Sequence, residues 1–523
     1  MRRTITLIAG LAVGAAALAV LPTEAAEPTS PARTEVVAPV PTLTWTDCGD
    51  RTECATPRVP LDYDDPTGPT TPLHLLRVPA GDPAHRIGTL FVNPGGPGAT
   101  ASDFAAYFGA LVAPAVANRF DIVGIDPRGT SKPTMRCVTD EQRPRGAHVP
   151  FPVTTKEAQL WIGLDTWVRR ACRTGPAPIT QHMSTADTAR DMDLIRQALG
   201  EARLSYYGIS YGSYLGATYA AMFPGRVRAM VIDGVLDPVA WANGRNGTGE
   251  TVPFSTRLKS GAGAADALTS ALDKCNQVGH RHCALAPHAR YKWAKLVHRL
   301  RRGPAWFEGQ RLTYQDLVSG TLGYLYAADS YPDLMRILAH LHDRITGRTS
   351  TRTQRPLLPR PAADPRGIAG PYSATGFGSV TNPFVGVACA DTDNPRDPWA
   401  WWRAARAFEK SQPWFGALWT WISSPCANWP GITKEDAFHG PFKVVTAHPV
   451  LVIGNSHDPA TPISGARAAS GLLTGSRLLE LRTWGHGAIG NGPCIIARTR
   501  DYLVSLRLPP VGAVCLPARR LFQ

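Results

Sequence analysis

Residues 204–212 of the chain read LSYYGISYG, and residues 214–223 continue as YLGATYAAMF. The first segment begins with β-prone residues, and the second is typical of a helix that ends before Pro224 and Gly225. Together they predict a strand, a sharp turn centred on Ser210 and a helix. In such a turn only glycine fits two residues before and after the serine, because a Cβ there would clash with the backbone. The turn lifts the Ser210 hydroxyl out of a sheet, where a base can reach it.

Two strand candidates near the C-terminus each lead into a polar side chain. Residues 449–454, PVLVIG, form a continuous apolar run, as expected for a buried parallel strand, and the loop after them carries Asp458. Residues 476–481, SRLLEL, run towards His486, which is flanked by glycines. Because the carboxyl ends of parallel strands meet at one edge of a sheet, we expect the side chains of Ser210, Asp458 and His486 to converge there.

The order serine, aspartate, histidine along the chain is that of the catalytic triad in the α/β-hydrolase fold. Serine is a poor nucleophile at its own pKa, so His486 is the predicted base that takes the proton of Ser210 as the bond to substrate forms. Asp458 is predicted to orient the imidazole and to stabilise its charged form. The neighbouring His457 is expected to point to solvent.

Two other interpretations of the acid stay open. Asp458 is followed by a proline, and an Asp-Pro pair commonly opens a turn, so this carboxylate could cap its own loop instead. Asp233 and Asp237 follow another strand candidate, residues 229–232, and either of them could be the acid.

A glycine- and proline-rich loop is the candidate oxyanion hole. The strand candidate at residues 89–92, TLFV, opens into NPGGPG at residues 93–98. A tetrahedral intermediate needs two N–H donors, one from the residue after the nucleophile, here Tyr211, and one from such a loop. The prolines carry no N–H, so we predict Gly96 as the second donor, ahead of Gly95. The same residues would also build a tight turn, and the two interpretations are compatible.

The length of the chain, 523 residues, suggests a main domain with an insertion. Residues 42–238 alternate strand and helix patterns, as in a doubly wound, mostly parallel sheet. Residues 239–430 show helical periodicity and predict a mainly helical cap, and residues 431–523 return to the α/β core. Most of the 14 tryptophans lie in the predicted cap, where we expect the majority to pack helices together and a few to line a substrate cleft.

The N-terminal segment predicts export. Residues 1–25 combine Arg2 and Arg3 with an apolar stretch and a small-x-small cleavage pattern, which is typical of a secretory signal peptide. Residues 26–41 are rich in Pro, Ala and Thr and predict a disordered linker or pro-segment. No second apolar stretch reaches the ~18 to 20 residues that span a membrane. We therefore expect a secreted protein.

Ten cysteines in an exported chain indicate disulfides rather than free thiols. No two of them have C-x-x-C spacing and no histidine cluster accompanies them, so we expect neither a metal site nor a cofactor. Nearest-neighbour pairing is the simplest connectivity and predicts Cys48–Cys54, Cys137–Cys172, Cys275–Cys283, Cys389–Cys426 and Cys494–Cys515.

The net charge of +14 raises the question of a nucleic-acid partner. The arginines are scattered and no aromatic-basic repeat is present, so we expect none. A soluble monomer of this charge is instead expected to associate loosely with the acidic polymers of a cell envelope.

Several motifs together make the chain resemble the secreted tripeptidyl aminopeptidases and prolyl-aminopeptidase-like serine peptidases of actinobacterial type, in the α/β-hydrolase superfamily. Besides the loops described above, the resemblance is carried by DPRG at 126–129, DGVLDP at 233–238 and VACAD at 387–391. It implies a serine exopeptidase that releases di- or tripeptides from peptides with a free N-terminus through an acyl-enzyme. Related prolyl aminopeptidases open the oxyanion loop with a histidine, where this chain has Pro94.

Cleavage close to a free N-terminus requires an anion that holds the substrate ammonium group, because an unpaired buried charge is costly. The predicted cap offers Asp391, Asp393 and Glu250. We expect Asp391 to hold the ammonium group; the other interpretation is that it is a solvated loop acid.

Two other functions fit parts of the same pattern. An exported carboxylesterase or lipase would use the same triad, because one fold hosts both activities. A hydrolase-fold binding protein without activity is the third candidate, and the presence of Ser210, His486 and an acid argues against it.

Overall fold

The computed structural model describes residues 37–131, 135, 149–174, 178–345, 383–429 and 436–523. All of these residues belong to one compact unit. The predicted signal peptide and most of the predicted linker lie outside the described residues. The predicted borders of the cap, at residues 239 and 430, stay predictions.

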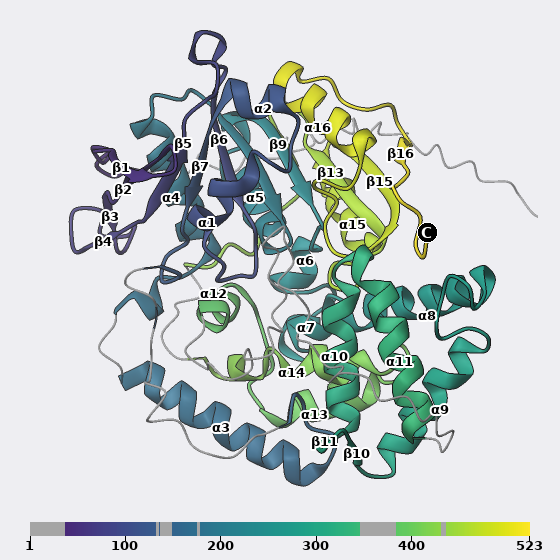
Figure 1. Cartoon of the computed structure of the whole chain (residues 1–523). Coiled ribbons are helices and arrows are strands. Elements are labelled where there is room, and N and C mark those ends of the chain that lie inside the picture. The colour runs from purple at the N-terminus through teal and green to yellow at the C-terminus, as the bar shows by residue number, and fades with distance from the viewer. Residues whose placement is uncertain (1–36, 132–134, 136–148, 175–177, 346–382, 430–435) are drawn as a thin grey trace, which may run out of the picture. The chain divides into compact units, whose positions relative to one another are not determined.

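The main sheet has ten strands (Figure 1). In the spatial order of the strands, which is given below, all neighbours from β7 to β16 pair in parallel. The neighbours from β1 to β7 pair in the antiparallel direction. This arrangement confirms the predicted α/β class with a mostly parallel sheet. In spatial order the strands are β1 (Thr46–Gly49), β2 (Thr52–Ala55), β5 (Leu75–Val78), β7 (Phe120–Ile125), β6 (Gly88–Asn93), β8 (Leu204–Ile209), β9 (Val227–Asp233), β13 (Leu451–His457), β15 (Arg477–Trp484) and β16 (Val514–Cys515).

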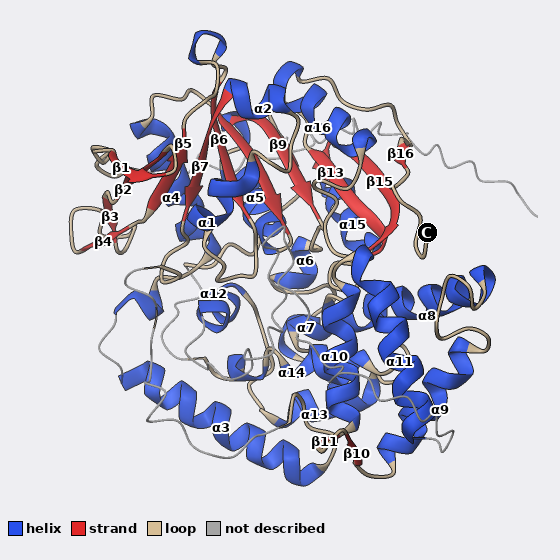
Figure 2. Cartoon of the chain, viewed as in Figure 1, coloured by secondary structure: helices blue, strands red, loops and turns tan. Residues whose placement is uncertain are grey.

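Helices cover both faces of this sheet (Figure 2). One apolar cluster joins it to α1 (Ala101–Phe108), α2 (Pro114–Arg119) and α16 (Pro493–Ser505). A second cluster contains α4 (Thr185–Ala198), α5 (Tyr211–Met222) and α15 (Ile463–Leu472). Every residue of β6, β7 and β8 is therefore buried, which explains why most of their residues are apolar.

The described chain between β9 and β13 is mainly helical. A helix from an earlier part of the chain, α3 (Thr155–Thr174), packs against it: Trp161 Nε1 donates to Ser424 Oγ at 3.1 Å. We call the segment between β9 and β13 the helical insertion. Its elements are α6 (Pro238–Trp241), α7 (Phe254–Arg257), α8 (Ser260–Val278), α9 (Ala289–Arg301), β10 (Ala305–Phe307), β11 (Gln310–Leu312), α10 (Tyr314–Leu325), α11 (Tyr331–Ile345), α12 (Pro383–Asp391), α13 (Trp399–Ala407), α14 (Phe415–Trp421) and β12 (Val444–Val445).

Four of the five predicted cysteine pairs lie at disulfide distance: Cys48–Cys54, Cys275–Cys283, Cys389–Cys426 and Cys494–Cys515. Cys137, the predicted partner of Cys172, lies outside the described residues, so that pair stays a prediction. Within the described ranges, no helix is both long and apolar enough to cross a membrane.

Candidate active site

Ser210 lies in the turn between β8 and α5, with a φ of 58° and a ψ of −123°. A positive φ is unfavourable for serine and is the kind of local strain found at functional sites. The glycines on either side have no room for a side chain. A Cβ at Gly208 would lie 2.3 Å from the carbonyl oxygen of Gly212, and one at Gly212 would lie 2.7 Å from that of Asn93. The predicted need for glycine at both positions is confirmed.

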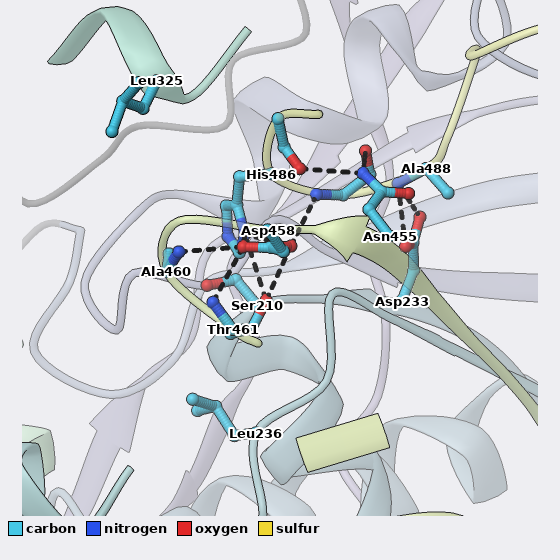
Figure 3. A network of polar contacts seen from close by, with 12 residues as sticks. Ser210, Asp233, Leu236, Leu325, Asn455, Asp458, Ala460, Thr461, His486 and Ala488 are labelled. Carbon is cyan, nitrogen blue, oxygen red and sulfur yellow. Dashed lines mark hydrogen bonds and ion pairs between the residues drawn. The ribbon is translucent and has the colours of Figure 1, made fainter. Parts of the chain in front are cut away.

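Asp458 and His486 face each other on the loops after β13 and β15 (Figure 3). The imidazole Nδ1 lies 2.9 Å from Oδ1 and 3.0 Å from Oδ2 of Asp458, and both side chains are buried. Asp458 Oδ1 also accepts hydrogen bonds from the backbone N–H groups of Ala460, at 2.9 Å, and Thr461, at 2.8 Å. The carboxylate is thus fixed in place. Because Nδ1 faces this carboxylate, Nε2 of the imidazole is available to accept a proton.

The two alternative acids do not contact the imidazole through a hydrogen bond. Asp233 accepts hydrogen bonds from Tyr207 Oη, at 2.9 Å, and from the backbone N–H groups of Ala488 and Ile489. It therefore ties the loop that carries the histidine to β9, and burial raises its pKa. Asp237 caps α6 and forms an ion pair with Arg245.

Three further residues hold the histidine loop, and the sequence analysis did not identify them. Thr461 Oγ1 donates to Asp458 Oδ2 at 2.9 Å and lies 3.2 Å from the imidazole Nδ1. Asn455 Nδ2 donates to the carbonyl oxygens of the two glycines beside His486, at 2.9 and 2.8 Å. The carbonyl oxygen of Tyr326 accepts from the His486 N–H at 2.8 Å, and the two rings pack edge to face at 5.3 Å. His457, predicted to point to solvent, is partly exposed, and its Nδ1 lies 2.7 Å from Oδ2 of Asp266 at the surface.

The loop after β6 lies directly against the turn of Ser210. A Cβ at Gly95 would lie 2.8 Å from the backbone nitrogen of Tyr211, so the two segments are in contact. The Gly95 N–H donates to Asn93 Oδ1 at 2.9 Å, whereas the Gly96 N–H has no hydrogen-bond partner among the described residues. Of Gly95 and Gly96, Gly96 is thus the one whose N–H stays available, as an oxyanion hole requires.

Comparison with known proteins agrees with this geometry. Residues 88–258 match the family described as alpha/beta hydrolase fold, and residues 412–515 match the family described as TAP-like protein. The chain is 30% identical over 497 residues to the tripeptidyl aminopeptidase of Streptomyces lividans, covering 91% of this chain and 87% of that protein. The chain belongs to the TAP-like family of α/β hydrolases.

Two other members show how the names in this family vary. The serine protease Hip1 of Mycobacterium tuberculosis is 30% identical over 482 residues, covering 88% of this chain and 87% of that protein. Carboxylesterase B of the same organism is 32% identical over 543 residues, covering 97% of each chain. Similarity of this degree therefore accompanies both peptidase and esterase names.

In this TAP-like hydrolase, Ser210, His486 and Gly96 line one narrow cavity of about 40 Å³. Ser210 Oγ and His486 are not hydrogen-bonded to each other in this structure; in unliganded hydrolases such bonds are often long and tighten when substrate binds. Most of the remaining wall is apolar or aromatic and comes from the helical insertion. Its other residues are Leu236, Trp241, Phe254, Ser255, Leu258, Ser260, Tyr326, Phe384, Trp419, Ile422, Ala460 and Thr461.

Asp391 does not line this cavity. It is 1% exposed, and both of its carboxylate oxygens already accept hydrogen bonds, from Thr185 and Trp241. Burial raises the pKa of Asp391 to about 7. This placement does not fit the predicted contact with a substrate ammonium group, and it also rules out a solvated loop acid. Neither Asp393 nor Glu250 lines the cavity.

Proposed function

We propose that this chain is a secreted serine exopeptidase that releases di- or tripeptides from peptides with a free N-terminus. One observation carries the proposal: His486, paired with the buried Asp458, lines a cavity together with a serine held in a strained turn, in a chain of the TAP-like family. The roles of the residues follow from that geometry.

In the proposed reaction, Ser210 Oγ attacks the carbonyl carbon of the scissile peptide bond while His486 Nε2 takes its proton. The oxygen of the tetrahedral intermediate accepts hydrogen bonds from the N–H groups of Tyr211 and Gly96. His486 then gives the proton to the leaving amine, and the acyl-enzyme remains. Water, activated by the same imidazole, releases the acyl group as a short peptide. Asp458 stabilises the imidazolium in both halves of the reaction.

The apolar wall of the cavity supports a substrate with a small apolar residue before the cleaved bond. Trp241, Phe254 and Trp419 present flat surfaces that exclude water from such a side chain. The narrow space between these rings favours alanine or proline over a large residue. The chain acts as a monomer, and its net charge of +14 favours loose association with acidic envelope polymers.

A carboxylesterase is the second candidate, and two observations favour it. One relative is named carboxylesterase B, and the described residues that line the cavity include no carboxylate to hold an ammonium group. An ester with a short acyl chain needs only the triad, the oxyanion hole and an apolar wall.

A panel of three substrate sets separates the two candidates: tripeptide anilides with a free amine, the same anilides with an acetylated N-terminus, and short acyl esters. The exopeptidase proposal predicts turnover of the free-amine anilides that is lost on acetylation. Turnover of esters alone would replace it with the carboxylesterase. A Ser210→Ala variant, expressed and purified in the same way, gives the background for each set.

A further inference from the structure

Asp391 occupies a point where three helices meet. It ends α12, and its Oδ1 accepts a hydrogen bond from the backbone N–H of Thr185, the first residue of α4, at 2.7 Å. Its Oδ2 accepts from Thr185 Oγ1 at 2.6 Å and from Trp241 Nε1, in α6, at 3.3 Å. A carboxylate at the first turn of a helix is also stabilised by the helix dipole. The backbone at Asp391 is held as well: Cys389 is in a disulfide with Cys426, and the Asp391 carbonyl oxygen lies 3.1 Å from His439 Nε2.

The hydroxyl of Thr185 also contacts the hydroxyl of Tyr211. An ionised carboxylate can only accept hydrogen bonds, so the single proton of Thr185 Oγ1 points to Asp391. Thr185 Oγ1 must then accept from Tyr211, whose own proton points to the threonine. The hydrogen bonds thus form a series with a fixed direction, from Tyr211 through Thr185 to Asp391, which we call the hydrogen-bond series.

This series of hydrogen bonds begins at Tyr211, the residue next to the proposed nucleophile. Tyr211 follows Ser210, its ring is 1% exposed, and its N–H is one of the two proposed oxyanion donors. The ring of Trp241 packs on the ring of Tyr211 at 5.7 Å and also lines the cavity. One carboxylate therefore anchors both the oxyanion residue and part of the substrate wall.

We propose that Asp391 and Thr185 are positioning residues that set the oxyanion hole through Tyr211, and that neither contacts the substrate. The proposal rests on the proposed triad and oxyanion hole, but not on the choice between peptide and ester. Donors in an oxyanion hole stabilise a transition state only when they are already aimed at the developing charge. A small displacement of the Tyr211 N–H therefore lowers the rate of the chemical step without changing the affinity for substrate.

Four variants test this hydrogen-bond series: Asp391→Asn, Thr185→Val, Tyr211→Phe and, as the matched control, Thr185→Ser. Asparagine presents an N–H donor to groups that already donate, and valine removes the hydroxyl without changing the shape. We expect each to lower kcat by ~10- to 100-fold while KM stays within about twofold of the wild type. Tyr211→Phe removes only the first donor of the chain and should show a smaller loss of kcat. Thr185→Ser keeps the hydroxyl and should stay near the wild-type kcat. Assays at pH 8 keep Asp391 mainly ionised.

Both a free-amine tripeptide anilide and a short acyl ester are measured. The positioning role predicts the same fractional loss of kcat on both, because both reactions use the oxyanion hole. A contact with the ammonium group predicts instead a raised KM for the anilide alone, and that result would overturn the proposal. Failure of the exopeptidase proposal would appear as absent anilide turnover in the wild type, and the ester would still test the positioning role.

A double-mutant cycle separates positioning from general destabilisation. If the hydrogen-bond series acts through Tyr211, Thr185→Val should lower kcat much less in a Tyr211→Phe background than in the wild type. Additive losses would overturn the proposal. Thermal melting of each variant shows whether the protein is folded, and Tyr211→Phe, which keeps the buried ring, preserves the test if Asp391→Asn does not fold. A Thr185→Val variant with wild-type kcat would also overturn it.

Discussion

At the carboxyl edge of the sheet, the proposed catalytic acid is held mainly by neighbours in the sequence: Asp458 forms hydrogen bonds with groups two, three and 28 residues away. In the helical insertion, Asp391 accepts hydrogen bonds from Thr185 and Trp241, which lie 206 and 150 residues away in the sequence. Both carboxylates are buried and accept several hydrogen bonds. Asp458 faces the imidazole directly, whereas Asp391 reaches Tyr211, the residue after the proposed nucleophile, only through the hydroxyl of Thr185. In the proposed mechanism, the edge of the sheet therefore supplies the reacting groups through short loops, and the insertion supports them through packing between distant helices.

The largest effect should come from the edge of the sheet. Replacing Asp458 by asparagine keeps its shape but disturbs the imidazole tautomer, and we expect kcat to fall by about 10⁴-fold. Asp233→Asn is the matched control, because that carboxylate bonds backbone N–H groups and Tyr207 rather than the imidazole. We expect it to lower kcat by no more than ~10-fold. Steady-state kinetics on one substrate compare the two, and equal losses would show that the acid has been wrongly assigned.

Glycines in the two regions should respond in opposite ways. A Cβ at Gly208 would lie 2.3 Å from a backbone oxygen of the turn, so Gly208→Ala should destabilise the fold by at least about 2 kcal/mol. Gly320 lies in α10 of the insertion, and a Cβ there would have no neighbour within 4 Å. Gly320→Ala should stabilise the protein by about 0.5 to 1 kcal/mol, because alanine is the better helix former. Urea unfolding measures both, and a neutral Gly208→Ala would contradict the geometry of the turn.

Thr461 offers a smaller test of the edge of the sheet. Thr461→Val keeps the volume of the side chain and removes the hydrogen bond to Asp458 Oδ2. A hydrogen bond to a charged group contributes about 1.5 to 3 kcal/mol, so we expect kcat to fall by ~10-fold or more, and Thr461→Ser to restore it. Unchanged kinetics would show that the backbone N–H groups suffice.

The hydrogen-bonded residues are close in the sequence at the edge of the sheet and far apart in the insertion. This difference also explains which parts of the site could be predicted from the sequence. Ser210, Asp458 and His486 follow strand ends, and each is marked by local patterns of glycine and apolar residues, so their placement was accessible. Thr461 had a weak local signal, as a threonine three residues after an aspartate in a turn.

Other parts of the site had no local signal. Tyr326 reaches the histidine loop, and Thr185 reaches Asp391, only because helices from distant parts of the chain pack together. For the same reason the sequence suggested that Asp391 holds the substrate ammonium group and gave no sign of its contacts with Thr185 and Trp241. The packing of α3 against the insertion could not be predicted from its position before Ser210 either.

The smallest predicted effect concerns Asp165 in α3, which is 4% exposed and packs near Ser424 and Arg169. Burial raises the pKa of Asp165 to about 7, well above the ~3.9 of an unfolded chain. The protonated form is thus favoured in the folded state, so this residue stabilises the protein below about pH 4 and loses that contribution as the pH rises towards 7. Asparagine does not titrate. The melting temperature of Asp165→Asn should therefore lie close to that of the wild type near pH 4.5 and exceed it by a few degrees at pH 8. A difference that stays constant between these two values would contradict the buried, proton-binding state of Asp165, and with it the close packing of α3 against the helical insertion.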